Sequence, residues 1–449
     1  VQTCALPIFL IRTLQLVMSL SLLVVIHEMG HFLFARLFKT RVEKFCLFFD
    51  PWFTLFKFKP KNSETEYGIG WLPLGGYVKI AGMIDESMDT EQMKQPMQPW
   101  EFRAKPAWQR LLIMVGGVLF NFLLALFIYS MILFAWGDSY IPVQKVPLGM
   151  DFNETMHQAG FRDGDVLISA DGVPFERMGS DLLTAIVDAR QVTVLRNGQE
   201  ASVYIPDNLM DRLLADSTRF ADFRYPFVID SIVDGRPAAL AGLQPGDSIT
   251  QLDGRNIAYF DFKEEMLKRK ADGQASHDIC LTYVRSGVTD TLTLTTDSLY
   301  EIGITADMRT AHLLPVVKKE YTFFSSFPAG VMLGVNTLKG YVGQMKYLFS
   351  KEGAKQLGGF GTIGSIFPAT WDWHQFWYMT AFLSIILAFM NILPIPALDG
   401  GHVLFLIYEI VARRKPSDKF MERAQMVGMF LLFALLLWAN LNDVLRFIF

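Results

Sequence analysis

The stretch VVIHEMGHFLFAR, residues 24–36, places two histidines and a glutamate inside an apolar run. In an α-helix His27 and His31 share one face, so both imidazoles can reach one metal ion. Glu28 lies beside them, where a general base would stand. Polar side chains in apolar surroundings are costly unless they are paired, ligated or hydrated. The pattern predicts a metal site inside an apolar helix; a pair of hydrogen-bonded core histidines is the alternative.

The composition around this stretch is that of a membrane protein with a soluble portion. Of 449 residues, 51% are hydrophobic and 19% are charged, whereas about 25% are charged in typical soluble proteins. The net charge of −4 argues against a nucleic-acid partner. Three widely separated cysteines predict neither a disulfide framework nor a thiolate metal site. No cleaved signal peptide is expected, because the first apolar run continues into the histidine motif.

Four apolar regions are long enough to cross a bilayer, which takes roughly 20 helical residues. They are residues 8–38, 108–136, 372–412 and 421–447. The third is too long for one span, and Pro394 and Pro396 predict that its helix is interrupted. Within 309–371, the apolar segment 327–349 carries Lys339 and is expected to lie along the membrane surface, with a fifth span as the alternative. The predicted fold class is a polytopic α-helical membrane protein with four transmembrane helices.

Basic residues next to the spans predict the orientation. Lys and Arg gather after the first span, before the second, and between the third and fourth: Arg36, Lys39, Arg41, Lys44, Arg103, Lys105, Arg110, Arg413, Arg414, Lys415, Lys419 and Arg423. Such loops stay cytoplasmic. The region 41–105 is then cytoplasmic, and the large insert, 137–371, lies on the other side. In a bacterium this predicts an inner-membrane protein with a periplasmic insert.

The insert contains a repeat. AGFRDGDVLISADG (159–172) aligns without gaps to AGLQPGDSITQLDG (241–254), an offset of 82 residues. Each copy predicts a loop, a short strand and a turn, in two α+β domains at 138–222 and 223–308. The second copy resembles the strand-turn segment of PDZ domains, which bind extended peptides at a sheet edge. A PDZ-bound peptide is therefore an expected partner.

A catalytic metal site needs a third protein ligand. His157, His277 and His312 lie in the insert, and His374 lies near the outer end of the third span. Asp399, in FMNILPIPALDGGH, is the sole acid between Asp372 and Glu409 and is the better candidate. The alternative is that Asp399 caps the helix that begins at Gly400. His402 is assigned a supporting or structural role.

HEMGH in the first span together with NILPIPALDGG in the third resembles the site-2 protease family of intramembrane zinc metalloproteases. The order of spans and the tandem PDZ-like insert are similar to the RseP branch of that family. The resemblance implies that His27, His31 and Asp399 bind Zn²⁺ and that Glu28 is the catalytic base. It implies substrates that are single-span membrane proteins, such as anti-sigma factors already cut on the outer side, or remnant signal peptides. Two departures are GGVLFNF, where relatives tend to carry Gly-Pro before the Asn, and Phe360, where Pro is usual.

Cutting a transmembrane helix requires that it be locally extended, which leaves backbone groups without partners in lipid. The alternating stretch YGIGWLPLGGYVKIAG (67–82), with Gly75 and Gly76, predicts a membrane-associated β-hairpin whose edge could pair with the substrate; an ordinary cytoplasmic hairpin is the alternative. Asn391, Pro394 and Pro396 are expected to contact the substrate. Asn121 either does the same or joins spans together.

Two other functions compete with the intramembrane protease. The first is a membrane-tethered PDZ scaffold without a working metal site, against which Glu28 argues, because a structural site gains nothing from a base. The second is a metalloprotease of soluble peptides, which usually has its third ligand a short way after the two histidines. A charged loop begins there instead.

Overall fold

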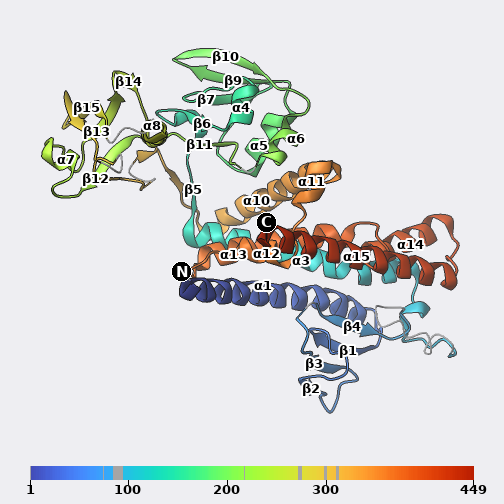
Figure 1. Cartoon of the computed structure of the whole chain (residues 1–449). Coiled ribbons are helices and arrows are strands. Elements are labelled where there is room, and N and C mark those ends of the chain that lie inside the picture. Colours follow the sequence, from blue (N-terminus) through green and yellow to red (C-terminus); the bar gives the residue numbers. More distant parts are fainter. Residues whose placement is uncertain are drawn as a thin grey trace. The chain divides into compact units, whose positions relative to one another are not determined.

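The computed structural model describes residues 2–73, 75–83, 95–216, 218–271, 276–297, 301–309 and 313–448. His312, one of the histidines surveyed as a ligand, lies outside them. The chain forms two units, one of Val1–Gly137 with Glu320–Phe449 and one of Asp138–Lys319 (Figure 1).

The first unit is a bundle of long apolar helices. Its four candidate spans lie in α1 (Gln2–Leu37), α3 (Ala107–Trp136), α13 (Trp373–Ile392) and α15 (Asp418–Ile448). Each of the four apolar regions predicted to cross a bilayer therefore contains a long apolar helix. α3 is the central helix, because it packs against α1, α13, α10 (Phe323–Met345) and α14 (Asp399–Ala412).

Glycines bring α1 and α3 into close contact. A Cβ on Gly30 would lie 2.2 Å from the carbonyl oxygen of Gly116, and a Cβ on Gly116 would lie 2.7 Å from that of Gly30. Small residues of this kind let two helix backbones approach each other. The contact holds the histidine motif of α1 against the middle of α3.

The predicted interruption of the third apolar region is present. α13 ends at Ile392 and α14 begins at Asp399. Pro394 and Pro396 occupy the turn between them, and Ala397 has a φ of 84°. The turn places Asp399 in the first turn of a helix that packs on α3.

The remaining helices of this unit are shorter or more polar. α10 packs along α3, where a Cβ on Gly330 would lie 2.3 Å from Ser130 Oγ. Its position relative to a membrane stays a prediction. The others are η1 (Phe102–Ala104), η3 (Lys346–Phe349), α11 (Lys351–Gln356) and α12 (Phe360–Ser365).

The region between α1 and α3 forms a four-stranded sheet, and the predicted hairpin over 67–82 is wrong. The strands are β1 (Val42–Leu47), β2 (Phe56–Phe58), β3 (Glu66–Ile69) and β4 (Tyr77–Ile80), in the order β2-β3-β1-β4. β3 and β4 both form, but β1 lies between them, parallel to β3 and antiparallel to β4. Alternation in the sequence predicts strands but does not choose their partners. β4 is an edge strand of this sheet.

The second unit consists of small sheets with short helices. Its strands are β5 (Asp138–Tyr140), β6 (Met150–Phe152), β7 (Val166–Ala170), β8 (Val173–Pro174), β9 (Gln191–Arg196), β10 (Gln199–Tyr204), β11 (Ala221–Phe223), β12 (Phe227–Ile232), β13 (Ser248–Leu252), β14 (Arg255–Asn256), β15 (Asp278–Arg285), β16 (Val288–Thr295), β17 (Ile304–Ala306) and β18 (Val317–Lys319). Its helices are η2 (Val143–Lys145), α4 (Glu154–Gln158), α5 (Ser180–Asp188), α6 (Leu209–Ala215), α7 (Pro237–Leu240) and α8 (Tyr259–Ala271). Separate hydrophobic cores form around Leu167 and around Ile249.

The sequence repeat is also a repeat in structure. Asp165 accepts hydrogen bonds from the Arg196 guanidinium, which also donates to the carbonyl of Gly160 at 2.9 Å. In the second copy Asp247 pairs with Arg285, which donates to the carbonyl of Gly242 at 2.9 Å. The turn residues match as well, since positive φ recurs 82 residues later, at Gly160, Gly164, Asp171 and Gly172 and at Gly242, Gly246, Asp253 and Gly254.

Candidate metal centre

Three metal-ligating atoms converge where α1, α3 and α14 meet. His27 and His31 lie one turn apart on α1, and Asp399 faces them from the first turn of α14. Asp399 Oδ2 lies 3.1 Å from His27 Nε2 and 3.3 Å from His31 Nε2, and the two nitrogens are 3.2 Å apart. Both histidines are buried. Within the part of the chain that the structure describes, this is the one cluster of three or more His, Cys, Asp or Glu side chains close enough to share a metal ion.

The spacing of these atoms fits a tetrahedral zinc ion. Zinc binds imidazole nitrogen and carboxylate oxygen at about 2.0–2.2 Å, so two ligands of a tetrahedral ion lie about 3.3 Å apart. The three observed separations, 3.1–3.3 Å, form the edges of one face of such a tetrahedron. Asp399 Oδ2 is buried and has no hydrogen-bond donor among the described residues. A buried carboxylate oxygen without a donor is expected where it serves as a metal ligand.

Helix α3 orients both imidazoles. His31 Nδ1 lies 2.8 Å from the carbonyl oxygen of Ile113, so Nδ1 carries the hydrogen and Nε2 is free to bind a metal. His27 Nδ1 faces the side chain of Asn121, with Nδ2 at 3.3 Å, and Asn121 Oδ1 is buried without a donor among the described residues. Rotating this amide by half a turn places Oδ1 on His27 Nδ1–H and satisfies both atoms.

Capping by Asp399, the alternative role considered from the sequence, is not what the structure shows. The N-cap of α14 is Leu398, and no side chain caps this helix. Asp399 instead turns its carboxylate toward the two histidines of α1.

A large cavity opens at the ligands and reaches the edge strand β4. Its volume is about 700 Å³. It is lined by His27, Glu28, His31, Lys44, Phe49, Asp50, Pro51, Leu72, Gly76, Tyr77, Val78, Lys79, Ile80, Met83, Met114, Asn391, Ala397, Leu398, Asp399, His402 and Gln425. Glu28 and Val78 of β4 both line this cavity, so the candidate base faces the space that the ligand cluster and β4 share.

A polar network holds β4 in place at one end of this cavity. Asp50 forms an ion pair with Lys44 of β1 and accepts hydrogen bonds from Tyr77 Oη at 2.7 Å and Thr54 Oγ1 at 2.6 Å. Burial and the Asp50 carboxylate raise the pKa of Tyr77 to about 12. Burial opposes ionisation of Asp50, but Lys44 and the two hydroxyls outweigh it and lower the pKa of this carboxyl. Asp50 is therefore an anion that ties β1 to β4 at neutral pH.

Comparison with known proteins decides the family. A profile of peptidase family M50 matches residues 15–435. The chain belongs to peptidase family M50. It is 28% identical to a Vibrio cholerae protein named "Putative zinc metalloprotease", over 96% of this chain and 97% of that one. It is 26% identical to Metalloprotease MmpA of Caulobacter vibrioides, over 98% of this chain and 96% of that one.

Membership of family M50 confirms the resemblance to the site-2 proteases and the prediction of a metalloprotease, with zinc as the expected cofactor. The geometry agrees with the predicted metal ligands, because His27, His31 and Asp399 meet within ligand distance although 368 residues separate His31 from Asp399. The catalytic role predicted for Glu28 stays a prediction.

The residues predicted to bind substrate do not all lie in the same place in the structure. Asn391 and Gly76 line the large cavity, whereas Pro396 lines a smaller one beside it. Gly75 lies against the ring of Phe49, and Pro394 is in the turn before α14. Asn121 is completely buried between His27 and α13, where its backbone carbonyl accepts a hydrogen bond from the Ser384 hydroxyl at 2.7 Å. This position favours the role of joining spans over contact with substrate.

Several residues of the site carry little or no signal in the sequence. Gly117 is one of many glycines, but a Cβ there would lie 2.4 Å from His31 Nε2 and 2.8 Å from His27 Nε2. The carbonyl of Ile113 is a backbone group that any residue would supply. The Gly116–Gly117 pair and the polar Gln425 at the start of an apolar helix were the available hints.

Proposed function

We propose that this zinc metalloprotease hydrolyses peptide bonds within the transmembrane segments of single-span membrane proteins. The observation that carries the proposal is the position of the ligand cluster. His27 and His31 belong to α1, a helix long and apolar enough to span a membrane. Asp399 begins the shorter α14, which packs on the spanning-type helix α3, and the cavity beside the three ligands is lined by the edge strand β4. A protease of soluble peptides would not need its ligands among four helices of this kind.

The geometry provides for an extended substrate. Backbone N–H and C=O groups of a segment unwound in the membrane need new partners. β4 lies at the edge of its sheet, and its residues line the cavity, so a segment added beside β4 would pair with it and pass the ligand cluster.

The chemistry requires a base beside the bond to be cut. His27, His31 and Asp399 would hold the zinc ion, which would supply a Lewis acid for the carbonyl and bring the pKa of a bound water to about 7. Glu28, adjacent to His27 on α1, takes the proton from the attacking water and delivers it to the leaving nitrogen. Glu28 lines the same cavity as Val78 of β4, beside which the substrate strand would lie.

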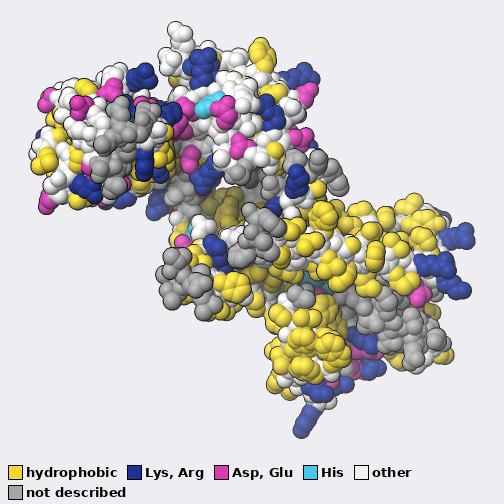
Figure 2. Space-filling model, viewed as in Figure 1, with side chains coloured by type: hydrophobic (Ala, Val, Ile, Leu, Met, Phe, Trp, Pro, Cys, Tyr) yellow, Lys and Arg dark blue, Asp and Glu magenta, His cyan; other side chains and the backbone are white. Residues whose placement is uncertain are grey.

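The surface of the first unit supports a membrane location. Figure 2 shows hydrophobic side chains along the helices, with Lys and Arg gathered at the end of the bundle where α14 meets α15. A second hydrophobic area covers the sheet (Figure 2), where Trp52, Phe53, Leu55, Phe56 and Phe58 are all exposed. Aromatic and aliphatic side chains of this kind fit the boundary between lipid headgroups and acyl chains. We place the sheet at the cytoplasmic boundary of a bacterial inner membrane and the second unit in the periplasm.

The repeated domains of the second unit serve substrate selection in this proposal. Their PDZ-like strand-turn segments are duplicated in contacts and in backbone conformation. Peptide-binding folds on the outer side of the membrane would admit substrates whose outer domain has been removed, such as cleaved anti-sigma factors, or remnant signal peptides.

The test is a pair of variants at the metal centre, assayed on a model single-span protein in liposomes. Glu28→Gln should retain zinc and lose cleavage, because the base is removed and the ligands remain. Asp399→Asn should lose both zinc and cleavage. A Glu28→Gln chain that still turns over substrate contradicts the role of Glu28. A wild-type chain that binds zinc and cuts only soluble peptides contradicts intramembrane proteolysis.

A further inference from the structure

An extended substrate has two hydrogen-bonding edges, and β4 can satisfy only one of them. Residues along a strand direct their N–H and C=O groups alternately to the two sides. The edge turned away from β4 would face the helical wall of the cavity. This wall consists of residues from α13, the turn before α14, α14 itself and α15. The reasoning here rests on the proposed function.

Two side chains of that wall carry a primary amide, Asn391 of α13 and Gln425 of α15. A primary amide offers donors and an acceptor, as a peptide group does, so it can pair with an N–H and a C=O of a strand together. Asn391 was already predicted to bind substrate. Gln425 has no role in the metal centre.

Gln425 is largely buried and has no hydrogen-bond partner among the residues that the structure describes. It is only 8% exposed, although α15 otherwise presents mostly exposed apolar side chains. The amide atoms of Gln425 are not among the side-chain atoms that are sealed from solvent without a partner, so they reach the open cavity, where a ligand could bind them.

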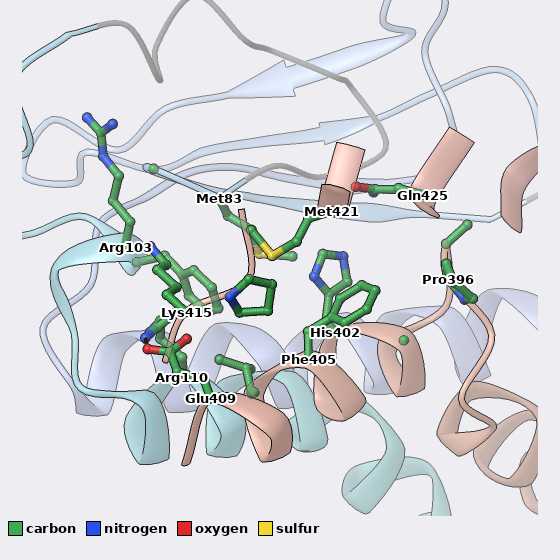
Figure 3. A pocket seen from close by; sticks show the side chains of 16 residues that line it. Met83, Arg103, Arg110, Pro396, His402, Phe405, Glu409, Lys415, Met421 and Gln425 are labelled. Atoms are coloured by element: carbon green, nitrogen blue, oxygen red, sulfur yellow. Dashed lines mark hydrogen bonds and ion pairs between the residues drawn. The ribbon is translucent and has the colours of Figure 1, made fainter. Parts of the chain in front are cut away.

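The backbone of α15 fixes where this amide stands. A Cβ on Gly428, three residues further on, would lie 1.7 Å from the carbonyl oxygen of Pro396, so α15 packs directly on the turn before α14. Gln425 therefore sits at the junction of two cavities, the large one at the ligands and a smaller one of about 60 Å³. In Figure 3, Gln425 and Pro396 lie at one end of the smaller cavity, and Arg103, Arg110, Lys415 and Glu409 lie at the other.

Two cations at the charged end of the smaller cavity are already paired with carboxylates. Arg110 is paired with Glu409 at 2.5 Å, and Arg103 with Glu101 at 2.6 Å. Met83 and Met421 lie between the two ends (Figure 3). Gln425 lines both cavities, so its amide is within reach of the one that contains the ligands.

We propose that Gln425 binds the substrate backbone, pairing with N–H and C=O groups on the edge of the extended segment that is turned away from β4. With β4 on one side and Gln425 on the other, the segment to be cut is held on both edges. Binding the backbone favours an extended chain over a helix irrespective of its side chains. It selects substrates that unwind easily.

The test replaces Gln425 by Met, which has a similar length and shape but no amide. We expect kcat/KM for the model single-span protein in liposomes to fall about 10- to 100-fold, as for a buried hydrogen-bond partner that is lost. Zinc content should not change, and the melting temperature should stay equal or rise, because an unpaired polar group leaves an apolar wall. Met421→Leu, one turn earlier on α15, is the matched control and should retain kcat/KM within about twofold, since the swap conserves volume.

Two further measurements make the outcome decisive. In a Glu28→Gln background, Gln425→Met should weaken binding of the uncut substrate. Replacing single substrate amides by esters should reveal a position whose effect disappears in Gln425→Met, as expected for two groups in contact.

Wild-type kcat/KM in Gln425→Met would overturn the inference, as would a loss of activity accompanied by lost zinc or a lower melting temperature, which assigns Gln425 to structure. If the wild-type chain itself does not cut the membrane segment, the proposed function fails instead.

Discussion

Gly117→Ala should disable the metal centre without altering a ligand. The added methyl would lie 2.4 Å from His31 Nε2 and 2.8 Å from His27 Nε2, whereas ordinary contact begins at 3.4 Å. The ring of His31 must therefore retreat by about 1 Å. Gly117 cannot yield, because the neighbouring Gly116 is already in backbone contact with Gly30 of α1.

A displacement of this size exceeds what a zinc site tolerates. Metal–ligand distances hold within about 0.2 Å, and the ligand atoms are already spaced 3.1–3.3 Å apart, as a tetrahedral ion requires. Changes that only reorient a ligand weaken metal binding about 10- to 100-fold, so we expect at least about 100-fold here. The free energy of unfolding should change less. Overpacking costs about 1–3 kcal/mol, but replacing a helical glycine by alanine stabilises the helix by about 1 kcal/mol.

The assay is a zinc titration against a competing chelator, together with the melting temperature of the metal-free chain. Gly340→Ala on α10 is the control, because a Cβ there meets nothing within 4 Å. It should retain wild-type zinc affinity and melt at the same or a slightly higher temperature. If Gly117→Ala bound zinc as tightly as the wild type, the geometry described for the ligand cluster would be refuted.

Two further predictions concern buried polar groups. Asn121→Ala should weaken zinc binding about 10- to 100-fold, because it removes the acceptor for His27 Nδ1–H. Asn121→Asp retains an acceptor and should lose less zinc affinity in the same titration. Equal zinc affinities of the two variants and the wild type would show that Asn121 does not orient His27. In the second unit, Arg285→Met should lower the urea midpoint of unfolding, because Asp247 stays buried with the amide of Gln244 as its remaining donor. Burial disfavours the Asp247 anion, but Arg285 and Gln244 outweigh this effect and lower the pKa of Asp247. The pair therefore stabilises the fold above the unfolded-state pKa of about 3.9. As the pH falls below that value, the difference in stability between wild type and Arg285→Met should narrow. Lys268→Met, in the exposed pair with Glu264, should leave the urea midpoint nearly unchanged, and an equal loss in both variants would refute the reasoning.

Much of the site could be predicted because its signals are local. The two histidines of HEMGH are four residues apart, and helix geometry alone places them on one face. The four long apolar helices follow from composition over about 20 residues each. The repeated turns could be aligned because a positive φ selects Gly and Asp at matching positions, such as Gly172 and Gly254.

Prediction from the sequence failed where a residue or strand contacts a partner that is distant along the chain. The two strands expected to form a hairpin over residues 67–82 lie on either side of β1 and do not pair with each other. The sequence contains several alternating strands, and alternation does not say which of them pair. Asn121 has its role through contact with His27, and Gly117 through the space it leaves for two imidazoles.

The sequence by itself therefore determined the helices, the ligand types and the duplicated domains, since these depend on residues within a few turns of one another. Tertiary structure alone decided that Asp399 meets the two histidines, that β4 is an edge strand, and that Gln425 faces the cavity unpaired. Such facts depend on how closely α1, α3, α14 and α15 approach, and that approach is set by backbone contacts at glycines, which leave no periodic pattern in the chain.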